Sequence, residues 1–166
     1  MEFSVEVLGE RELLKAFRDV EGGVTDLRPA WSEVATAFYE IEQDAFQSDG
    51  HGTWPELSPA YAEMKHVEFP FMPTLRRTQS LYFALTRKGA DSGVYEETET
   101  SLTLGASGKA GAYGRAHMTP QGGRPARPPI NLREEDNRKL SKALGKYLAK
   151  LSSKAGFTQT GTGDLD

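Results

Sequence analysis

Histidines and carboxylates are the residues of this 166-residue chain that could do chemistry. His51, His66 and His117 are far apart, and no His-x-x-x-His or His-Glu-x-x-His spacing occurs, so the sequence does not predict a zinc site. The chain has no cysteine, which excludes disulfides, thiolate metal sites and a cysteine nucleophile. We therefore expect neither a bound metal nor a cofactor.

Paired carboxylates could act as a general acid and base, as they do in glycosidases. Glu96 and Glu97 lie in a predicted strand, where neighbouring side chains point to opposite faces. Glu134 and Glu135 open a predicted helix, where the helix dipole favours negative charge. Both pairs indicate structural roles, so we expect no catalytic residue and no enzyme; a small cell-wall hydrolase is the less favoured alternative.

Glycines and arginines give no stronger signal for phosphate or DNA. Gly105, Gly108, Gly111 and Gly114 recur every third residue without a following Lys-Ser/Thr, which favours a hinge over a phosphate-binding loop. The arginines are interleaved with few aromatic residues in a chain of net charge -4, so sequence-specific DNA recognition is not predicted.

Charge is distributed unevenly along the chain. Residues 1–74 hold 5 basic and 15 acidic side chains, whereas residues 75–133 hold 9 basic and 4 acidic ones. Opposite charges of this kind can attract within one subunit or between neighbouring subunits, although solvated helix faces are an equally good interpretation. No apolar run approaches the roughly 20 residues that a bilayer requires, so we expect a soluble protein with no membrane contact.

The elements that must position these residues follow from periodicity. Apolar alternation predicts a strand over residues 2–8, and helical spacing predicts a short helix over residues 10–20. A continuous apolar stripe predicts a long helix over residues 27–47, capped by Asp26. Its opposite face carries carboxylates, namely Glu33, Glu40, Glu42 and Asp44.

Residues 53–65 read TWPELSPAYAEMK and predict an anchored loop followed by a helix. Trp54 precedes a proline, which favours extended backbone, and Ser58-Pro59 supplies a capping hydroxyl before a proline in the first turn. Tyr61 and Met64 share one side of that helix. We expect Trp54 and Leu57 to fix the loop against the long helix.

The second half of the chain changes from helix to strand and back. We expect a helix through Leu75 to about residue 87, capped by Thr74 or Thr78, and then a hairpin over residues 94–105. A flexible turn over residues 107–111 and a strand or short helix over residues 112–118 would follow. Residues 119–129, rich in proline, glycine and arginine, predict an extended arm or exposed loop. A final amphipathic helix begins near Asn131 or Arg133 and carries acids in its first turn.

The order of strand, helices, strands and helix predicts an α+β fold. We expect a small antiparallel sheet packed by the long amphipathic helix and the C-terminal helix, with an extended loop or arm. Residues 1–155 would form a single domain, and residues 156–166 a flexible C-terminal tail.

The order of motifs resembles the phage virion morphogenesis family, which includes tail completion and neck proteins of tailed bacteriophages. The likeness covers residues 38–151. It rests on TWPELSPAYAEMK at residues 53–65, LRRTQSL at 75–81, YGRAH at 113–117 and RPARPPINL at 124–132. Positions that match the family pattern are Trp54, Leu57, Ser58, Pro59, Lys65, Leu75, Thr78, Leu81, Arg127 and Pro128.

Two positions depart from the family pattern. Gln79 stands where a glycine is usual after Thr78, which puts the local turn in doubt. Pro129 and Ile130 stand where an aromatic-aliphatic pair is common, so the anchor there can differ.

The resemblance implies a structural, non-enzymatic subunit of a homo-oligomeric ring of six or twelve copies. Such a ring joins the phage head connector to the tail, surrounds double-stranded DNA without reading its sequence, and contacts neighbouring connector, tail terminator or tail tube proteins. It would lie in the neck of the virion and be assembled in the host cytoplasm. A tail terminator that caps the tail tube is the alternative.

Two sets of residues are candidates for contacts between subunits. Glu33, Glu40 and Asp44 on the long helix would either line the DNA channel or dock on the basic region of a neighbour. Arg124, Arg127 and Pro128 in the arm would reach an adjacent subunit or the connector.

Overall fold

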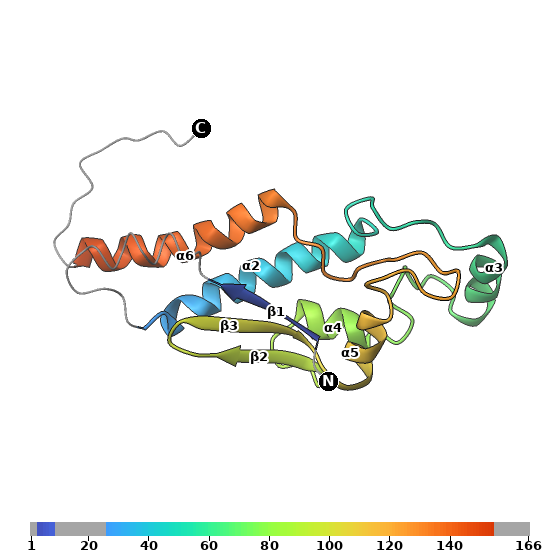
Figure 1. Ribbon diagram of the computed structural model, residues 1–166, viewed down its shortest axis with the longest axis horizontal. Coiled ribbons are helices and arrows are strands. Elements are labelled where there is room, and N and C mark those ends of the chain that lie inside the picture. The colour runs from blue at the N-terminus through green and yellow to red at the C-terminus, as the bar shows by residue number, and fades with distance from the viewer. Residues whose placement is uncertain (1–2, 9–25, 155–166) are drawn as a thin grey trace.

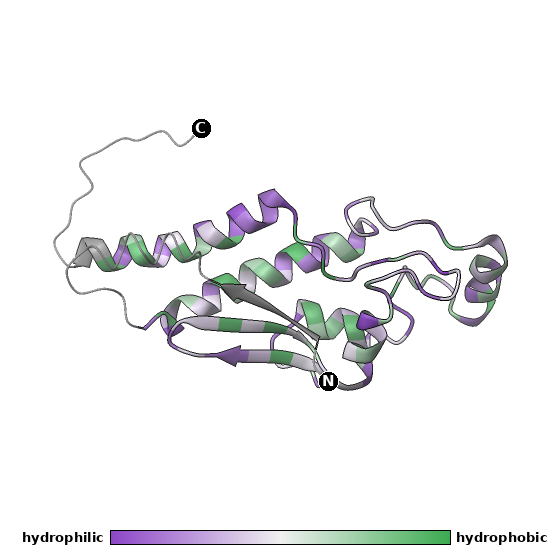
Figure 2. Ribbon diagram, in the orientation of Figure 1, coloured by the Kyte–Doolittle hydropathy of each residue, from purple (hydrophilic) through white to green (hydrophobic). Residues whose placement is uncertain are grey.

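The α+β architecture predicted from the sequence is confirmed (Figure 1). The computed structural model describes residues 3–8 and 26–154, so the predicted helix over residues 10–20 lies outside the described residues. Within those ranges the chain forms a three-stranded antiparallel sheet and five helices. Hydrophobic residues, green in Figure 2, run along α2, α4 and β3, which share the core.

Helix α2 (Arg28–Gln47) is the long helix that the apolar stripe predicts. The N-cap residue is Leu27, not Asp26 as predicted. Asp26 lies one residue earlier and still accepts a hydrogen bond from the backbone N–H of Arg28 at 3.0 Å, which satisfies a donor at the helix start. The stripe is buried throughout, and its largest side chains are Trp31, Phe38 and Phe46. Helices α4 and α6 both pack on α2.

The sheet has strand β3 (Ser101–Ala106) at its centre, between β1 (Phe3–Leu8) and β2 (Gly93–Glu97). Both pairings are antiparallel, so the predicted N-terminal strand and the predicted hairpin are confirmed. The turn of the hairpin is fixed to the start of α2, because the Trp31 Nε1–H donates to the carbonyl of Thr98 at 2.8 Å.

Helix α6 (Glu134–Lys154) packs along α2, as the amphipathic pattern predicts. Leu140, Leu144 and Leu148 are buried between the two helices, one turn apart. The acids of its first turn, Glu134, Glu135 and Asp136, lie where the helix dipole stabilises negative charge.

Helix α4 (Ser80–Thr86) is shorter than predicted, because the segment from residue 75 does not start the helix. Leu75 and Gln79 both have left-handed backbone, with φ of 58° and 60°, and this conformation interrupts a right-handed helix. Gln79 thus adopts the conformation that a glycine accommodates most easily, so the turn persists without the glycine.

Helix α5 (Gly108–Arg115) replaces the flexible turn and hinge predicted over its glycines, and it is the short helix that was one alternative for residues 112–118, although it begins earlier. Gly111 and Gly114 are buried in it, and a Cβ added at Gly114 would lie 3.1 Å from the Leu81 side chain. The glycines allow α5 to approach α4 closely. Spacing alone did not reveal this, because the partner helix is distant in sequence.

Residues 119–129 are only partly the exposed loop that their composition predicts. Gln121 and Arg124 form an exposed turn, whereas Arg127 and Pro129 are buried against the domain. The prediction of an unpacked arm is wrong for this second part. Hydrogen bonds to residues about 70 positions earlier in the chain hold it.

Helix α3 (Pro59–Glu68) projects from the end of the molecule farthest from the sheet (Figure 1). Ser58 is its N-cap residue and Pro59 its first residue, as predicted, but the Ser58 side chain makes no capping hydrogen bond. The helix buries Lys65 and leaves Tyr61 and Met64 exposed, so the apolar side of α3 does not pack on its own domain.

Candidate functional site

The Trp54 side chain joins three segments at the far end of α2. Its ring packs edge-on against Phe46 with centroids 5.5 Å apart, which confirms the predicted anchor on α2. Its Nε1–H donates to the carbonyl of Pro128 at 2.9 Å. Gly50 lies under the indole with φ of 68°, where a Cβ would collide with the ring. The loop after α2 and the segment at residues 127–130 are thus fixed to one side chain.

Arg127 is a buried cation held by backbone oxygens. Its Nε donates to the carbonyl of Pro55 at 2.8 Å and its Nη2 donates to the carbonyl of Glu56 at 2.7 Å. Its own backbone N–H donates to the carbonyl of His117 at 2.8 Å. The guanidinium therefore clamps the chain leading into α3 to the segment after α5, and this role is internal to the subunit.

Lys65 connects α3 to the segment that follows the helix. Its Nζ donates to the carbonyl of Pro73 at 2.9 Å, which ties the helix to the loop that follows it. Burial lowers the pKa of the Lys65 ammonium from its ordinary value. This hydrogen bond does not use the exposed side of α3, so that side is free for contacts outside the subunit.

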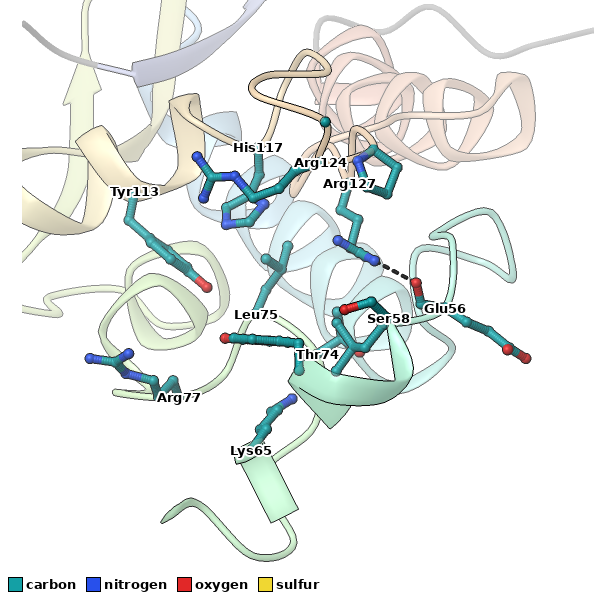
Figure 3. Close-up of a pocket in the computed structure, with 14 residues that line it drawn as sticks. Glu56, Ser58, Lys65, Thr74, Leu75, Arg77, Tyr113, His117, Arg124 and Arg127 are labelled. Carbon is teal, nitrogen blue, oxygen red and sulfur yellow. Dashed lines mark hydrogen bonds between the residues drawn. The ribbon is translucent and has the colours of Figure 1, made fainter. Parts of the chain in front are cut away.

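A cavity of about 630 Å³ lies between α3, α5 and the segment of residues 123–127 (Figure 3). We call it the α3 pocket. Its lining combines apolar and aromatic side chains with cations and hydroxyls. They are Glu56, Leu57, Ser58, Tyr61, Lys65, Thr74, Leu75, Arg77, Tyr113, His117, Gly123, Arg124, Pro125 and Arg127.

The electrostatics of the α3 pocket favour an anion. Lys65, Arg77, Arg124 and Arg127 line it, and the carboxylate of Glu56 points away from the cavity (Figure 3). A cavity with positive charge and low-dielectric walls attracts negative groups more strongly than an open surface does.

Two further titratable groups in the α3 pocket are held neutral. Burial raises the pKa of the Tyr113 hydroxyl. Burial also lowers the pKa of the His117 imidazole, and the nearby charges of Arg124 and Arg127 lower it further. At neutral pH the pocket therefore offers cations, the neutral imidazole of His117 and the phenol hydroxyl of Tyr113. This set can bind an apolar group that carries a carboxylate.

The carboxylate pairs considered as a general acid and base lie outside the α3 pocket. Glu96 and Glu97 are exposed on β2, at a distance from the pocket lining, and Glu134 and Glu135 begin α6. Within residues 3–8 and 26–154 no group of three or more His, Asp or Glu side chains could hold a metal ion. None of the helices in those same ranges is long and apolar enough to cross a membrane.

The structure brings half of the residues that carry the family resemblance into one pocket. Leu57, Ser58, Lys65, Leu75 and Arg127 line the same pocket, although they come from three separate sequence blocks. The others surround it more loosely. Trp54 and Pro128 form its supporting contact, Pro59 starts α3, Leu81 is buried under α5, and Thr78 is exposed outside it.

The acidic residues predicted on α2 lie outside the α3 pocket and face basic side chains of their own chain. Glu33 pairs with Lys150 at 3.1 Å, and Asp44 lies 3.3 Å from the Nδ1 of His51. Glu40 lines a groove between α2 and α6 together with lysines of α6. Contacts of these acids with another subunit or with DNA stay a prediction, as does an inter-subunit contact of the exposed Arg124.

Glu42 differs from these acids because it is buried, whereas the sequence places it on the solvated face. Its Oε2 and the Nε2 of His51 have no hydrogen-bond partner among the described residues. Burial raises the pKa of the Glu42 carboxyl well above its ordinary value, and the charge of Asp136 adds to the shift. Asp136 itself is paired with Arg133 at 2.9 Å.

Sequence reasoning missed Tyr61, Arg77, Tyr113 and His117 as members of one site. The four-residue spacings of Tyr61 with Lys65 and of Tyr113 with His117 place each pair on one helical face, which is the one available signal. No protein-family model, curated protein or solved structure matches this chain.

Proposed function

We propose that this chain is a structural subunit of a homo-oligomeric ring at the head-tail junction of a tailed bacteriophage, where double-stranded DNA passes without sequence recognition. The proposal takes its biological setting from the resemblance described above. Its physical support is the distribution of exposed apolar side chains, which cluster on one projecting element.

The observation that carries the proposal is the apolar surface of the α3 projection, residues 59–73. Of the six exposed large hydrophobic side chains among the described residues, five lie between residues 61 and 72. Val67 is 76% exposed and Phe71 is 95% exposed. Scattered apolar residues are ordinary on a protein surface, but a cluster on one projecting element is typical of an interaction site. The cluster comprises Tyr61, Met64, Val67, Phe71 and Met72.

The charges at the two ends of the molecule fit contacts between successive copies. The α3 pocket is basic, whereas Glu96, Glu97 and Glu99 are exposed around the turn between β2 and β3 at the opposite end (Figure 1). Contacts between two different surfaces of identical subunits generate a closed ring when the rotation between subunits closes. Complementary charge favours that orientation over its reverse.

Sedimentation velocity of the purified chain tests the proposal. The wild-type chain is expected to sediment as an oligomer, and Val67→Glu with Phe71→Glu to sediment as a monomer. Each side chain contributes about 1.5–3 kcal/mol when buried at an interface. Lys109→Glu, an exposed position on α5, is the matched control and should leave the oligomer intact. A wild-type chain that stays monomeric up to about 100 µM would contradict the proposal.

A further inference from the structure

The α3 pocket has the chemistry to bind an acidic and apolar peptide segment. Leu57, Leu75 and Tyr113 provide apolar wall, and Figure 3 shows the Tyr113 hydroxyl and the Lys65 ammonium pointing inward. Arg124 is exposed beside them, and Arg77 lines the same cavity with its guanidinium 4.9 Å from the Phe69 ring. A leucine-sized side chain would pack against this apolar wall, while the carboxylates that flank it would form ion pairs with the arginines.

The chain itself contains a segment of this kind after α6. Residues 155–166 read AGFTQTGTGDLD, in which Asp164 and Asp166 flank Leu165 and no lysine or arginine occurs. Its charge is opposite to that of the pocket, and its two large apolar residues are Phe157 and Leu165. We propose that the α3 pocket binds residues 164–166 of a neighbouring copy of this chain.

The length that residues 155–166 can span decides whether the bound segment comes from the same copy or from a neighbouring one. Helix α6 ends at Lys154, and the pocket lies beyond the opposite end of that helix (Figure 1). At 1.5 Å per residue, 21 residues of α6 span about 30 Å. Twelve fully extended residues span about 40 Å, so the segment would have to run straight along its own helix and on to the pocket. A neighbouring pocket has no such constraint.

This inference deepens the proposed function. It rests on the proposed function in one respect only, namely that the bound segment comes from another copy of the chain. It assigns a partner to the α3 pocket. It also orders the subunits around the ring, because each subunit would insert its residues 164–166 into the pocket of the next. Because the contact pairs carboxylates with partly exposed arginines, it weakens as salt is added.

Fluorescence anisotropy with a labelled peptide tests the pocket. The peptide comprises residues 155–166, acetylated and amidated, and the protein is the full chain carrying Asp164→Asn, Leu165→Ser and Asp166→Asn, so that its own segment does not compete. We expect saturable binding that weakens by about tenfold or more when Arg124→Glu is added. Lys109→Glu makes the same charge change outside the pocket and should leave binding unchanged. Equal binding of the peptide to the Arg124→Glu protein, or of a scrambled peptide to either protein, would overturn the inference.

Mixing two variants then separates a neighbour from the same copy. The Arg124→Glu chain keeps its C-terminal segment, and the triply substituted chain keeps its pocket. Contact between copies predicts that the mixture forms a heterodimer in sedimentation velocity, although neither variant forms the wild-type oligomer alone. No heterodimer would overturn the contact between copies. If the wild-type chain is an oligomer and the peptide does not bind, this inference fails and the proposed function stands; if the wild-type chain is a monomer, the proposed function fails whatever the peptide does.

Discussion

Replacing Arg127 with alanine tests how the α3 pocket is held together. The guanidinium donates one hydrogen bond to the carbonyl of Pro55 and another to that of Glu56, and the side chain is 6% exposed. Arg127→Ala removes both hydrogen bonds and the buried stem. The chain leading into α3 then loses its connection to the segment after α5.

The size of the effect follows from these contacts. A hydrogen bond from a charged donor contributes about 1.5–3 kcal/mol. Pro55 and Glu56 are exposed residues, so water can replace part of what their carbonyls lose. We therefore expect the free energy of unfolding to fall by about 2–4 kcal/mol. For a chain of this size that corresponds to a Tm lower by roughly 4–16 °C.

Urea unfolding followed by tryptophan fluorescence measures this loss, because Trp31 and Trp54 are both buried. Arg124→Ala is the matched control. It removes the same side chain three positions away at an exposed site, and should change stability by less than about 0.5 kcal/mol. Equal effects of the two substitutions would refute the clamp assigned to Arg127. Arg127→Lys should behave like the alanine variant, since an ammonium does not reproduce the forked geometry.

Two further substitutions probe the end of α2. Trp54→Ala should lower the free energy of unfolding by about 3–5 kcal/mol, because it removes the contact with Phe46 and the hydrogen bond to Pro128. Urea unfolding measures this loss, and a variant of normal stability that fails only in assembly would contradict the structural role of Trp54. Glu42→Gln should stabilise the chain at pH 7 but not at pH 4 in thermal melts, since the folded state holds the Glu42 proton above the ordinary pKa of 4.5 and loses stability as pH rises past that value. The gain should grow by about 1.4 kcal/mol per pH unit while the folded carboxyl stays protonated, and a gain independent of pH would contradict it.

The sequence predicted those parts of the fold that depend on local periodicity. The buried stripe of α2, the alternation in the sheet and the leucines of α6 each repeat at the period of their element. Glu42 shows the limit of this reasoning. It has the spacing of the exposed acids on α2 but is buried where α6 crosses it, and such packing is not encoded in the pattern of one helix.

Part of the candidate site was predicted from the sequence, but its geometry was not. The resemblance selected Leu57, Lys65 and Arg127, yet the contacts that bring them together join residues more than 70 positions apart, as between Arg127 and Pro55. The prolines and glycines around Arg127 favoured an exposed arm. In the structure Arg127 is buried, and its guanidinium donates hydrogen bonds to the carbonyls of Pro55 and Glu56. For the same reason a short helix was only one of two alternatives for residues 112–118, because the glycines of α5 are explained by Leu81 of a distant helix.

Electron cryomicroscopy of the purified wild-type assembly tests the central claim most directly, namely that α3 and its pocket form the contact between subunits. The account predicts a closed ring in which Val67 and Phe71 are buried against the next subunit and density for residues 164–166 of a neighbour occupies the α3 pocket. A ring in which the α3 projection faces solvent and the pocket is empty, or a chain that remains monomeric, would contradict it.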